Sequence, residues 1–237
     1  MEFNIENRAV FRFGDFEIWL TDTIISTWVI MTVLIVAAVI VRIKLRKFSA
    51  VPSSGFQNAI EMIIEAFNGF LKNSAGEKLM YLGGWFFTVI TFILVSNISG
   101  LFFLRPPTAD WTVTFMLALV TFFLIQFCGV RHRKMEYLKN LCQPGLPLLA
   151  QLLFFLPLNI IGELARPVSL SFRLFGNVLG GMILMGLLYN MAPIFVQFGI
   201  PAAIHGFFDV IIGILQAYIF CLLSLSFIGA AAATAED

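Results

Sequence analysis

Arg173 has the clearest potential for chemistry in this sequence, because it carries a permanent positive charge inside a long apolar stretch. Between residues 141 and 191 the only charged residues are Glu163, Arg166 and Arg173. If this stretch lies in a membrane, inserting the guanidinium costs about 2.5 to 3.5 kcal/mol, and such a residue is functional by default. The alternative is a static salt bridge between Arg173 and either Glu163 or Asp209.

Arg173 belongs to a stripe of polar and small residues. Residues three or four apart lie on one face of an α-helix. Seven residues follow this spacing: Asn159, Gly162, Arg166, Ser169, Arg173, Asn177 and Gly180. Gly176, Gly180 and Gly181 also offer positions at which another helix could approach closely, although packing within this chain is the simpler interpretation for each. The pattern predicts a helix with one polar face.

A second polar stripe follows, made of His205, Asp209, Gly213 and Gln216. Protonatable groups along an apolar helix suit a proton path. Glu163, His205 and Asp209 could also suggest a metal site, but no second His pair or Cys set accompanies them, so we expect no metal or other cofactor. Motifs for nucleotide binding or hydrolysis are absent from the sequence, so we do not expect an enzyme.

The elements that must position these residues are membrane helices. Apolar residues make up 59% of the 237 residues, charged residues only 12%, and the mean hydropathy is +0.93, whereas a soluble domain is about a quarter charged. A spanning helix needs about 20 apolar residues, and residues 24–41, 83–104 and 111–130 each qualify. The stretches 141–191 and 200–233 exceed a perpendicular crossing, so they must tilt or bend.

We therefore predict an all-α integral membrane protein with about five membrane helices, the last two long and strongly tilted. It would form one polytopic domain, in which residues 1–23 are an external tail, residues 24–140 peripheral helices and residues 141–237 the ion path. Basic residues follow the first and third runs, so both loops should be cytoplasmic and the loop at 192–202 external. A net charge of +1 leaves no basic footprint for nucleic acid.

An amphipathic helix is predicted between the first two runs. Its apolar residues recur at helical spacing: Phe56, Ile60, Ile63, Ile64, Phe67 and Leu71. This helix either lies on the cytoplasmic membrane surface or against a partner, or it is a connector packed on its own bundle. The sequence leaves both possibilities open.

Four segments carry a resemblance to a known family. They read ELARPVSLSFRLFGN at 163–177, LQAYIF at 215–220, GFQNAIE at 55–61 and PTADWTVT at 107–114. Over nearly its whole length the chain resembles subunit a, of bacterial type, of the membrane (Fo) sector of F-type ATP synthase. The first two segments hold the diagnostic motifs.

The resemblance implies a non-catalytic, proton-translocating stator subunit with several spans in the bacterial plasma membrane. Its partners would be the rotating c-subunit ring, b-type stator stalks and, through the complex, the F1 catalytic head, besides membrane lipid. Two aqueous half-channels would lead to the ring carboxylates, with Arg173 between them. Gln216 matches the glutamine that lies opposite the arginine in the family. Asn177 matches the family's polar residue after the RLFG motif. A guanidinium stays protonated, so Arg173 would not itself pass protons.

Two positions depart from the family pattern. The pattern has Glu nine residues after the arginine and His seven residues before the glutamine, whereas this chain has Met182 and Asp209 there. A carboxylate has thus moved to the neighbouring helix, and the resemblance alone does not give the route of the half-channels. Asp209, Glu163 and His205 are the candidates for it.

Other functions remain as alternatives. A proton-coupled secondary transporter could use Arg173 to bind an anionic substrate, although the sequence shows no inverted repeat. An intramembrane enzyme would need a nucleophile with a base, or a three-ligand metal site, and neither constellation is apparent. The same stator role with Na⁺ as the ion is also open, because the selecting ligands would lie mainly on the ring.

Overall fold

Five long apolar helices dominate the structure. The computed structural model describes residues 7–13, 16–46, 55–102, 104–133, 153, 155–191, 204 and 206–233. Five helical stretches in this described part are long and apolar enough to cross a membrane. They are α1 (Asp22–Leu45), α3 (Gly83–Ile98) with the 3-10 helices η1 (Glu77–Leu82) and η2 (Ser99–Phe102) at its ends, α4 (Trp111–Arg133), α7 (Leu156–Met191), and α10 (Gly213–Ala232) preceded by the π-helix η5 (Phe207–Ile212). The predicted all-α membrane fold is confirmed.

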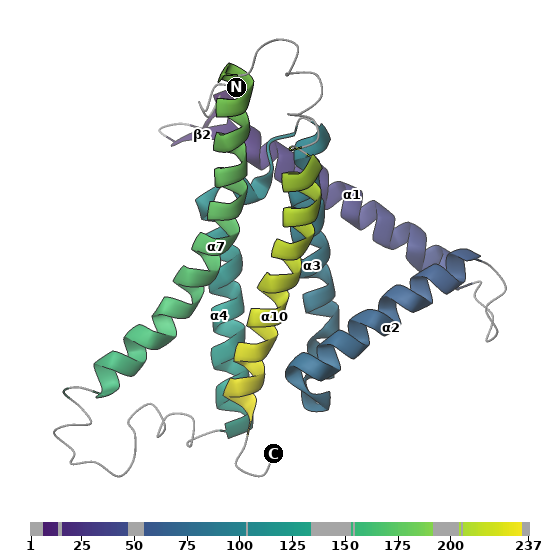
Figure 1. Cartoon of the computed structure of the whole chain (residues 1–237), viewed down its shortest axis with the longest axis vertical. Coiled ribbons are helices and arrows are strands. Elements are labelled where there is room, and N and C mark those ends of the chain that lie inside the picture. Colours follow the sequence, from purple (N-terminus) through teal and green to yellow (C-terminus); the bar gives the residue numbers. More distant parts are fainter. Residues whose placement is uncertain are drawn as a thin grey trace.

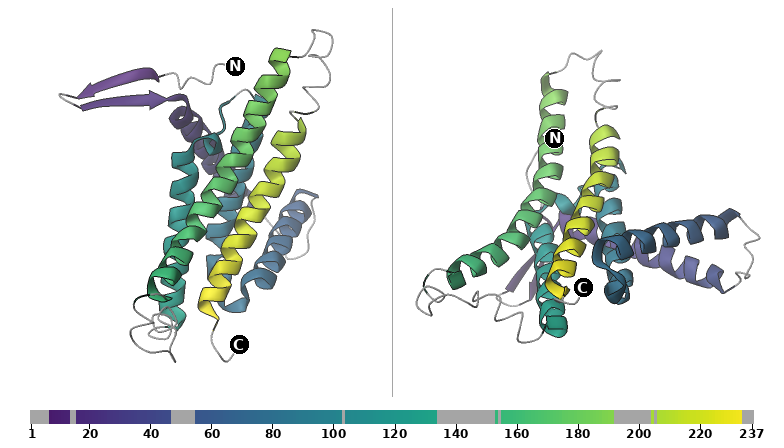
Figure 2. Two further views of the ribbon diagram at one scale, coloured as in Figure 1. Left: turned by 60° about the vertical axis from the view of Figure 1, so that its left-hand side comes forward. Right: turned by 60° about the horizontal axis from the view of Figure 1, so that its bottom comes forward.

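The helices α3, α4, α7 and α10 form a bundle in which successive helices run in opposite directions (Figures 1 and 2). The last turn of α4, the first turn of α7 and the last turn of α10 lie at one end of it, drawn at the bottom of Figure 1. The chain connects α3 to α4 at the other end, through a short 3-10 helix η3 (Pro107–Ala109). This up-and-down order is the one expected of consecutive membrane crossings.

Helix α7 is long and changes direction (Figures 1 and 2). Its 36 residues correspond to about 54 Å at about 1.5 Å per residue, well beyond the roughly 30 Å of a hydrocarbon core. Pro167 lies inside the helix and has no N–H to donate to the carbonyl of Glu163, which is a recognised cause of bending. The predicted need for a tilt or bend therefore has a local cause.

The core lies between α3, α4, α7 and α10. It is a single cluster of apolar side chains that includes Phe86, Ile93, Ala118, Ile125, Leu170, Leu174, Phe220, Leu225 and Ile228, all exposed by less than 5%. These residues recur at helical spacing on one face of each helix, so four narrow stripes meet. The opposite faces remain apolar and exposed, for example Phe123 on α4 and Ile183 on α7, as expected of surfaces that contact lipid or protein.

Helices α1 and α2 (Gly55–Ala75) project sideways from the bundle and meet at an angle (Figure 1). Among the described residues, the C-terminal part of α2 packs on the bundle, where Leu71 is fully buried and the ring of Phe70 lies 5.2 Å from that of Tyr218. Phe56 and Ile63, nearer its start, are exposed. The described contacts support the connector interpretation for the C-terminal part of the helix, and contact of its exposed start with a membrane surface or a partner stays a prediction.

An antiparallel hairpin precedes α1, and the sequence did not suggest it. Strand β1 (Asn7–Phe13) pairs with β2 (Phe16–Thr21), and the pairing is irregular between Asn7 and Ala9. The hairpin lies outside the bundle (Figure 2). What we expected to be a plain tail thus contains regular structure that leads directly into α1.

Candidate functional site

Arg173 lies on an exposed face of α7, near the middle of the bundle. The neighbouring Leu170, Ser171 and Leu174 are buried against the other helices, whereas Arg173 and Asn177 are exposed. Among the ion pairs and hydrogen bonds of the residues that the structure describes, none involves Arg173. The static salt bridge considered from the sequence is therefore not formed with Glu163 or Asp209, both of which are described.

Asn177 and Gln216 join α7 to α10. The Nδ2 atom of Asn177 donates a hydrogen bond to Oε1 of Gln216 at 2.5 Å, and Gln216 is only 2% exposed. Asn177 follows Arg173 by four residues and therefore lies next to it on the same face of α7. The structure thus brings together three of the predicted site residues, two of them in direct contact.

Glu163 pairs with a different arginine. Its Oε2 atom accepts hydrogen bonds from Nη1 of Arg166 at 2.9 Å and from Nε2 of Gln126 on α4 at 3.1 Å. The guanidinium carbon of Arg166 also lies 5.2 Å from the centre of the Phe227 ring on α10. Glu163 precedes Arg173 by ten residues, or about 15 Å along the helix, towards the end of the bundle where α4 ends.

Asp209 lies on the opposite side of Arg173. It is partly buried within the π-helix η5, seven residues before Gln216, and so about 10 Å further along the helix axis, towards the end where α3 connects to α4 (Figure 1). Glu163 and Asp209 therefore flank Arg173, one towards each end of the bundle. His205, the third candidate, lies outside the described residues.

A buried polar group near Asp209 was missed by the sequence analysis. Thr108 Oγ1 donates a hydrogen bond to Oδ1 of Asn97 at 2.8 Å, and Asn97 Nδ2 donates one to the carbonyl oxygen of Gly213 at 3.1 Å. Asn97 and Thr108 are 3% and 1% exposed. An Asn inside an otherwise apolar span is costly unless its amide is satisfied, and this was the signal that could have identified it.

The glycines of α7 divide into two groups. An added Cβ at Gly181 would lie 3.3 Å from the Phe208 ring, so this glycine serves packing within the chain as expected. At Gly176 and Gly180 an added Cβ would meet nothing within 4 Å among the described atoms. For these two, the described residues show no close packing within the chain, and the surface beside Arg173 is open as far as the structure describes it.

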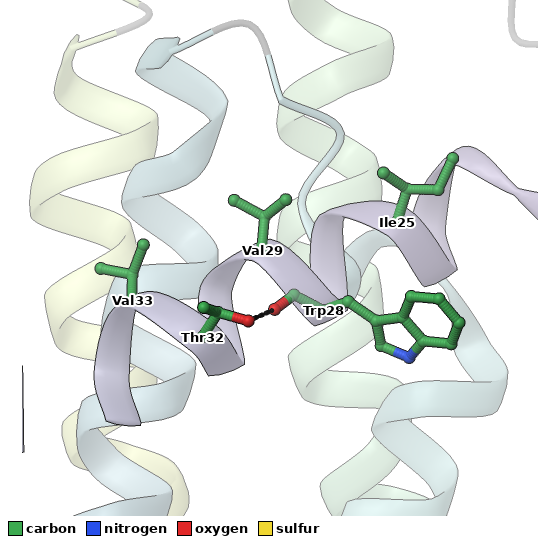
Figure 3. A pocket seen from close by; sticks show the side chains of 5 residues that line it. All are labelled: Ile25, Trp28, Val29, Thr32 and Val33. Atoms are coloured by element: carbon green, nitrogen blue, oxygen red, sulfur yellow. Dashed lines mark hydrogen bonds between the residues drawn. The ribbon is translucent and has the colours of Figure 1, made fainter. Parts of the chain in front are cut away.

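The remaining features of the structure suggest no competing chemistry. No group of three or more His, Cys, Asp or Glu side chains in the described part of the chain could hold a metal ion. A shallow pocket on α1 is lined by Ile25, Trp28, Val29, Thr32 and Val33 (Figure 3). It is apolar except for Thr32, whose hydroxyl donates to the carbonyl oxygen of Trp28 at 2.8 Å.

Comparison with known proteins shows which family the whole chain resembles. A family model described as "ATP synthase A chain" matches residues 24–229. "ATP synthase subunit a" of Moorella thermoacetica is 34% identical over 221 residues, which cover 92% of this chain and 93% of that protein. The protein of the same name from Citrifermentans bemidjiense is 36% identical over 214 residues, covering 87% and 86%. "ATP synthase subunit a, sodium ion specific" of Propionigenium modestum is 33% identical over 240 residues, covering 91% and 75%.

Proposed function

This chain belongs to the ATP synthase subunit a family, the non-catalytic ion-channel subunits of the Fo sector, and we propose that it carries protons to and from a rotating c-subunit ring through two half-channels separated by Arg173. It is a multi-pass membrane protein with five apolar helices and works in a complex with other Fo and F1 subunits. The observation that carries the proposal is the placement of Arg173, exposed and between two acids that lie towards opposite ends of the bundle.

Within the described residues Arg173 has no counter-charge, and we propose that one comes from outside the chain. A guanidinium at membrane depth is costly without a counter-charge, and within the described residues the acid nearest in sequence is already paired with Arg166. A ring carboxylate that loses its proton beside Arg173 would supply the counter-charge, and Arg173 would stabilise the ionised form. The carboxylate would need to be protonated again before it moved into lipid.

Arg173 also separates the two half-channels. Its guanidinium does not release a proton at physiological pH, so a proton cannot pass from one half-channel to the other through this side chain. Transfer then requires the ring to turn. Gln216 and Asn177 would support this arrangement by holding α10 against the turn of α7 that carries Arg173.

We assign one acid to each half-channel. Asp209 would line the external path, beside the buried polar group of Asn97 and Thr108. Glu163 would line the cytoplasmic path, near Gln126 and the basic end of α4. His205 stays a candidate of the external path by its position four residues before Asp209. This assignment follows the positive-inside orientation.

The surface beside Arg173 has room for a ring helix. Gly176 and Gly180 leave open space where small residues permit close approach. We propose that the c ring contacts this surface, and that b-type stalks and the F1 head complete the complex in the bacterial plasma membrane. Protons are the proposed ion. The sodium-specific name of the Propionigenium modestum relative keeps Na⁺ as a second candidate.

Isolation of the complex and cross-linking test the proposal. Tagged chain purified in mild detergent should bring down a c ring, b-type stalks and the catalytic head. A single cysteine replacing Gly180 should cross-link to a ring cysteine, and one replacing Gly84 on α3, which also has open space within the described structure, should not. Isolation of the chain alone, or equal cross-linking at both positions, would contradict the proposed ring contact.

A further inference from the structure

Two glycines allow the end of α3 to approach η5 and α10 closely. A Cβ added at Gly100 would lie 2.6 Å from Oδ2 of Asp209 and 3.2 Å from its Cγ. A Cβ added at Gly213 would lie 2.9 Å from the Cβ of Asn97. Both closest distances are shorter than real Cβ atoms tolerate, so something must shift at either position. At Gly213 the neighbour is a Cβ atom, so the helices would have to move apart, whereas at Gly100 it is the end of the Asp209 side chain, which could turn away while the helices keep their spacing.

The two contacts are reciprocal. Asn97 at the end of α3 and Gly100 in η2 are three residues apart, and Asp209 in η5 and Gly213 at the start of α10 are four apart, so the members of each pair are separated by about one helical turn. The helices run in opposite directions (Figure 1). Asn97 therefore lies against Gly213, and one turn further along Gly100 lies against Asp209. Each polar side chain thus faces a position that has no side chain.

Hydrogen bonds fix this register. The Oδ1 atom of Asn97 accepts a hydrogen bond from the Thr108 hydroxyl, and its Nδ2 atom donates one to the carbonyl oxygen of Gly213, where η5 passes into α10. These buried bonds resist sliding or rotation of α10 against α3, because a shift would leave buried polar groups unsatisfied. These bonds therefore help to hold η5 at the spacing from η2 that brings the Asp209 carboxylate against Gly100.

We propose that Gly100 is a positioning residue that seats the carboxylate of Asp209 at the external half-channel. The inference rests on the proposed function of Asp209. Among the described glycines, only Gly76 has a positive φ, so alanine at Gly100 would not strain the backbone by its φ angle. Its methyl group would instead act through space, by turning the Asp209 carboxylate away or by pushing η5 from α3.

A double-mutant cycle tests whether Gly100 positions the Asp209 carboxylate. The variants are Gly100→Ala, Asp209→Ala and the combination, with Gly84→Ala as the matched control, because it lies on α3 and its added Cβ would meet no described atom within 4 Å. Two quantities are measured for each: the amount of assembled complex, and the passive proton flux per assembled complex in membranes stripped of the catalytic head. Normalising the flux separates positioning from a purely structural loss.

The expected result is that Gly100→Ala lowers the flux per complex about as far as Asp209→Ala does, that the combination is no worse, and that Gly84→Ala matches the unmodified chain. If Gly100→Ala prevents assembly, recovery of assembly on adding Asp209→Ala supports the positioning role of Gly100, and failure to recover overturns that role. Normal flux in Gly100→Ala, or an additive loss in the combination, also overturns the positioning role of Gly100 while leaving Asp209 in the external half-channel. Normal flux in Asp209→Ala instead contradicts the proposed function of Asp209, and the positioning role of Gly100 falls with it.

Discussion

The side-chain amide of Asn177 donates a hydrogen bond to the side-chain carbonyl oxygen of Gln216 at 2.5 Å, and this bond joins α7 to α10 one helical turn from Arg173. Gln216 is almost completely buried while Arg173 is exposed. The two helices therefore contact each other on one side of Arg173 and leave its charged group accessible on the other. This relationship makes the Asn177–Gln216 pair the natural first target for mutation.

Asn177→Ala should lower both the stability of the complex and its pumping rate. The buried Gln216 carbonyl would lose its donor, which costs about 1 to 3 kcal/mol. Asn177→Leu combined with Gln216→Leu should recover stability, because no buried polar atom is left unsatisfied, but not pumping. Thermal unfolding and ATP-driven proton uptake per complex measure the two effects. Unchanged stability in Asn177→Ala would show that the bond contributes little.

Arg173→Ala should abolish ATP-driven pumping and ATP synthesis while the complex still assembles, and Arg173→Lys should be severely impaired. Loss of the fixed charge removes the counter-charge of the ionised ring carboxylate and the barrier between half-channels. Membranes stripped of the catalytic head should therefore become more permeable to protons. Proton permeability of such membranes is the decisive measurement.

Arg166→Gln is the matched control for Arg173, because it removes a second arginine from the same helix. Since Arg166 is paired with Glu163, its loss should reduce stability without adding a proton leak. Normal coupled synthesis by an assembled Arg173→Ala complex would end the assignment of Arg173 as the separating residue.

Asp209→Ala should slow proton flux strongly, because the acid lies partly buried in a long apolar helix and would line the external path. Asp209→Asn, which keeps the size of the side chain but not its charge, should be similarly slow. Flux is compared with that of the unmodified chain across a range of pH. Wild-type pumping by both variants would make Asp209 structural and leave Glu163 or His205 as the better candidate.

Glu163→Gln should destabilise the complex, because it leaves the Arg166 guanidinium without its counter-charge. Combining it with Arg166→Gln should recover stability. If Glu163 lines the cytoplasmic path, pumping per complex stays low in the double variant. Recovery of pumping together with stability would mean that Glu163 is only half of an ion pair.

Cysteine labelling should find the N-terminus and the loop at residues 192–202 outside, and the chain after α4 inside. The basis is the cluster of basic residues at the end of α4, Arg131, His132 and Arg133, and the positive-inside rule. Single cysteines are placed in a chain without its native Cys128, Cys142 and Cys221, and intact cells are compared with inverted vesicles. Labelling after α4 from outside would reverse the orientation.

The membrane helices and the exceptional status of Arg173 could be predicted from the amino-acid sequence. Run lengths, hydropathy and intramembrane charges are visible in the local sequence, and a charge placed in hydrocarbon is costly unless it gains a partner. Residues 24–41, 83–104 and 111–130 therefore predicted α1, α3 and α4 closely, and the motif around Arg173 indicated the family before any helix was placed in space.

Only the tertiary structure decided which polar groups meet. Asn177 could be predicted to share a face with Arg173, but its contact with Gln216, 39 residues further along the chain, depends on the relative rotation and height of two helices. For the same reason Glu163 turned out to pair with Arg166 and Gln126, and Gly100 to face Asp209. Such contacts depend on how side chains from distant segments pack together, and helical periodicity within one segment carries no information about the partner that lies across from it.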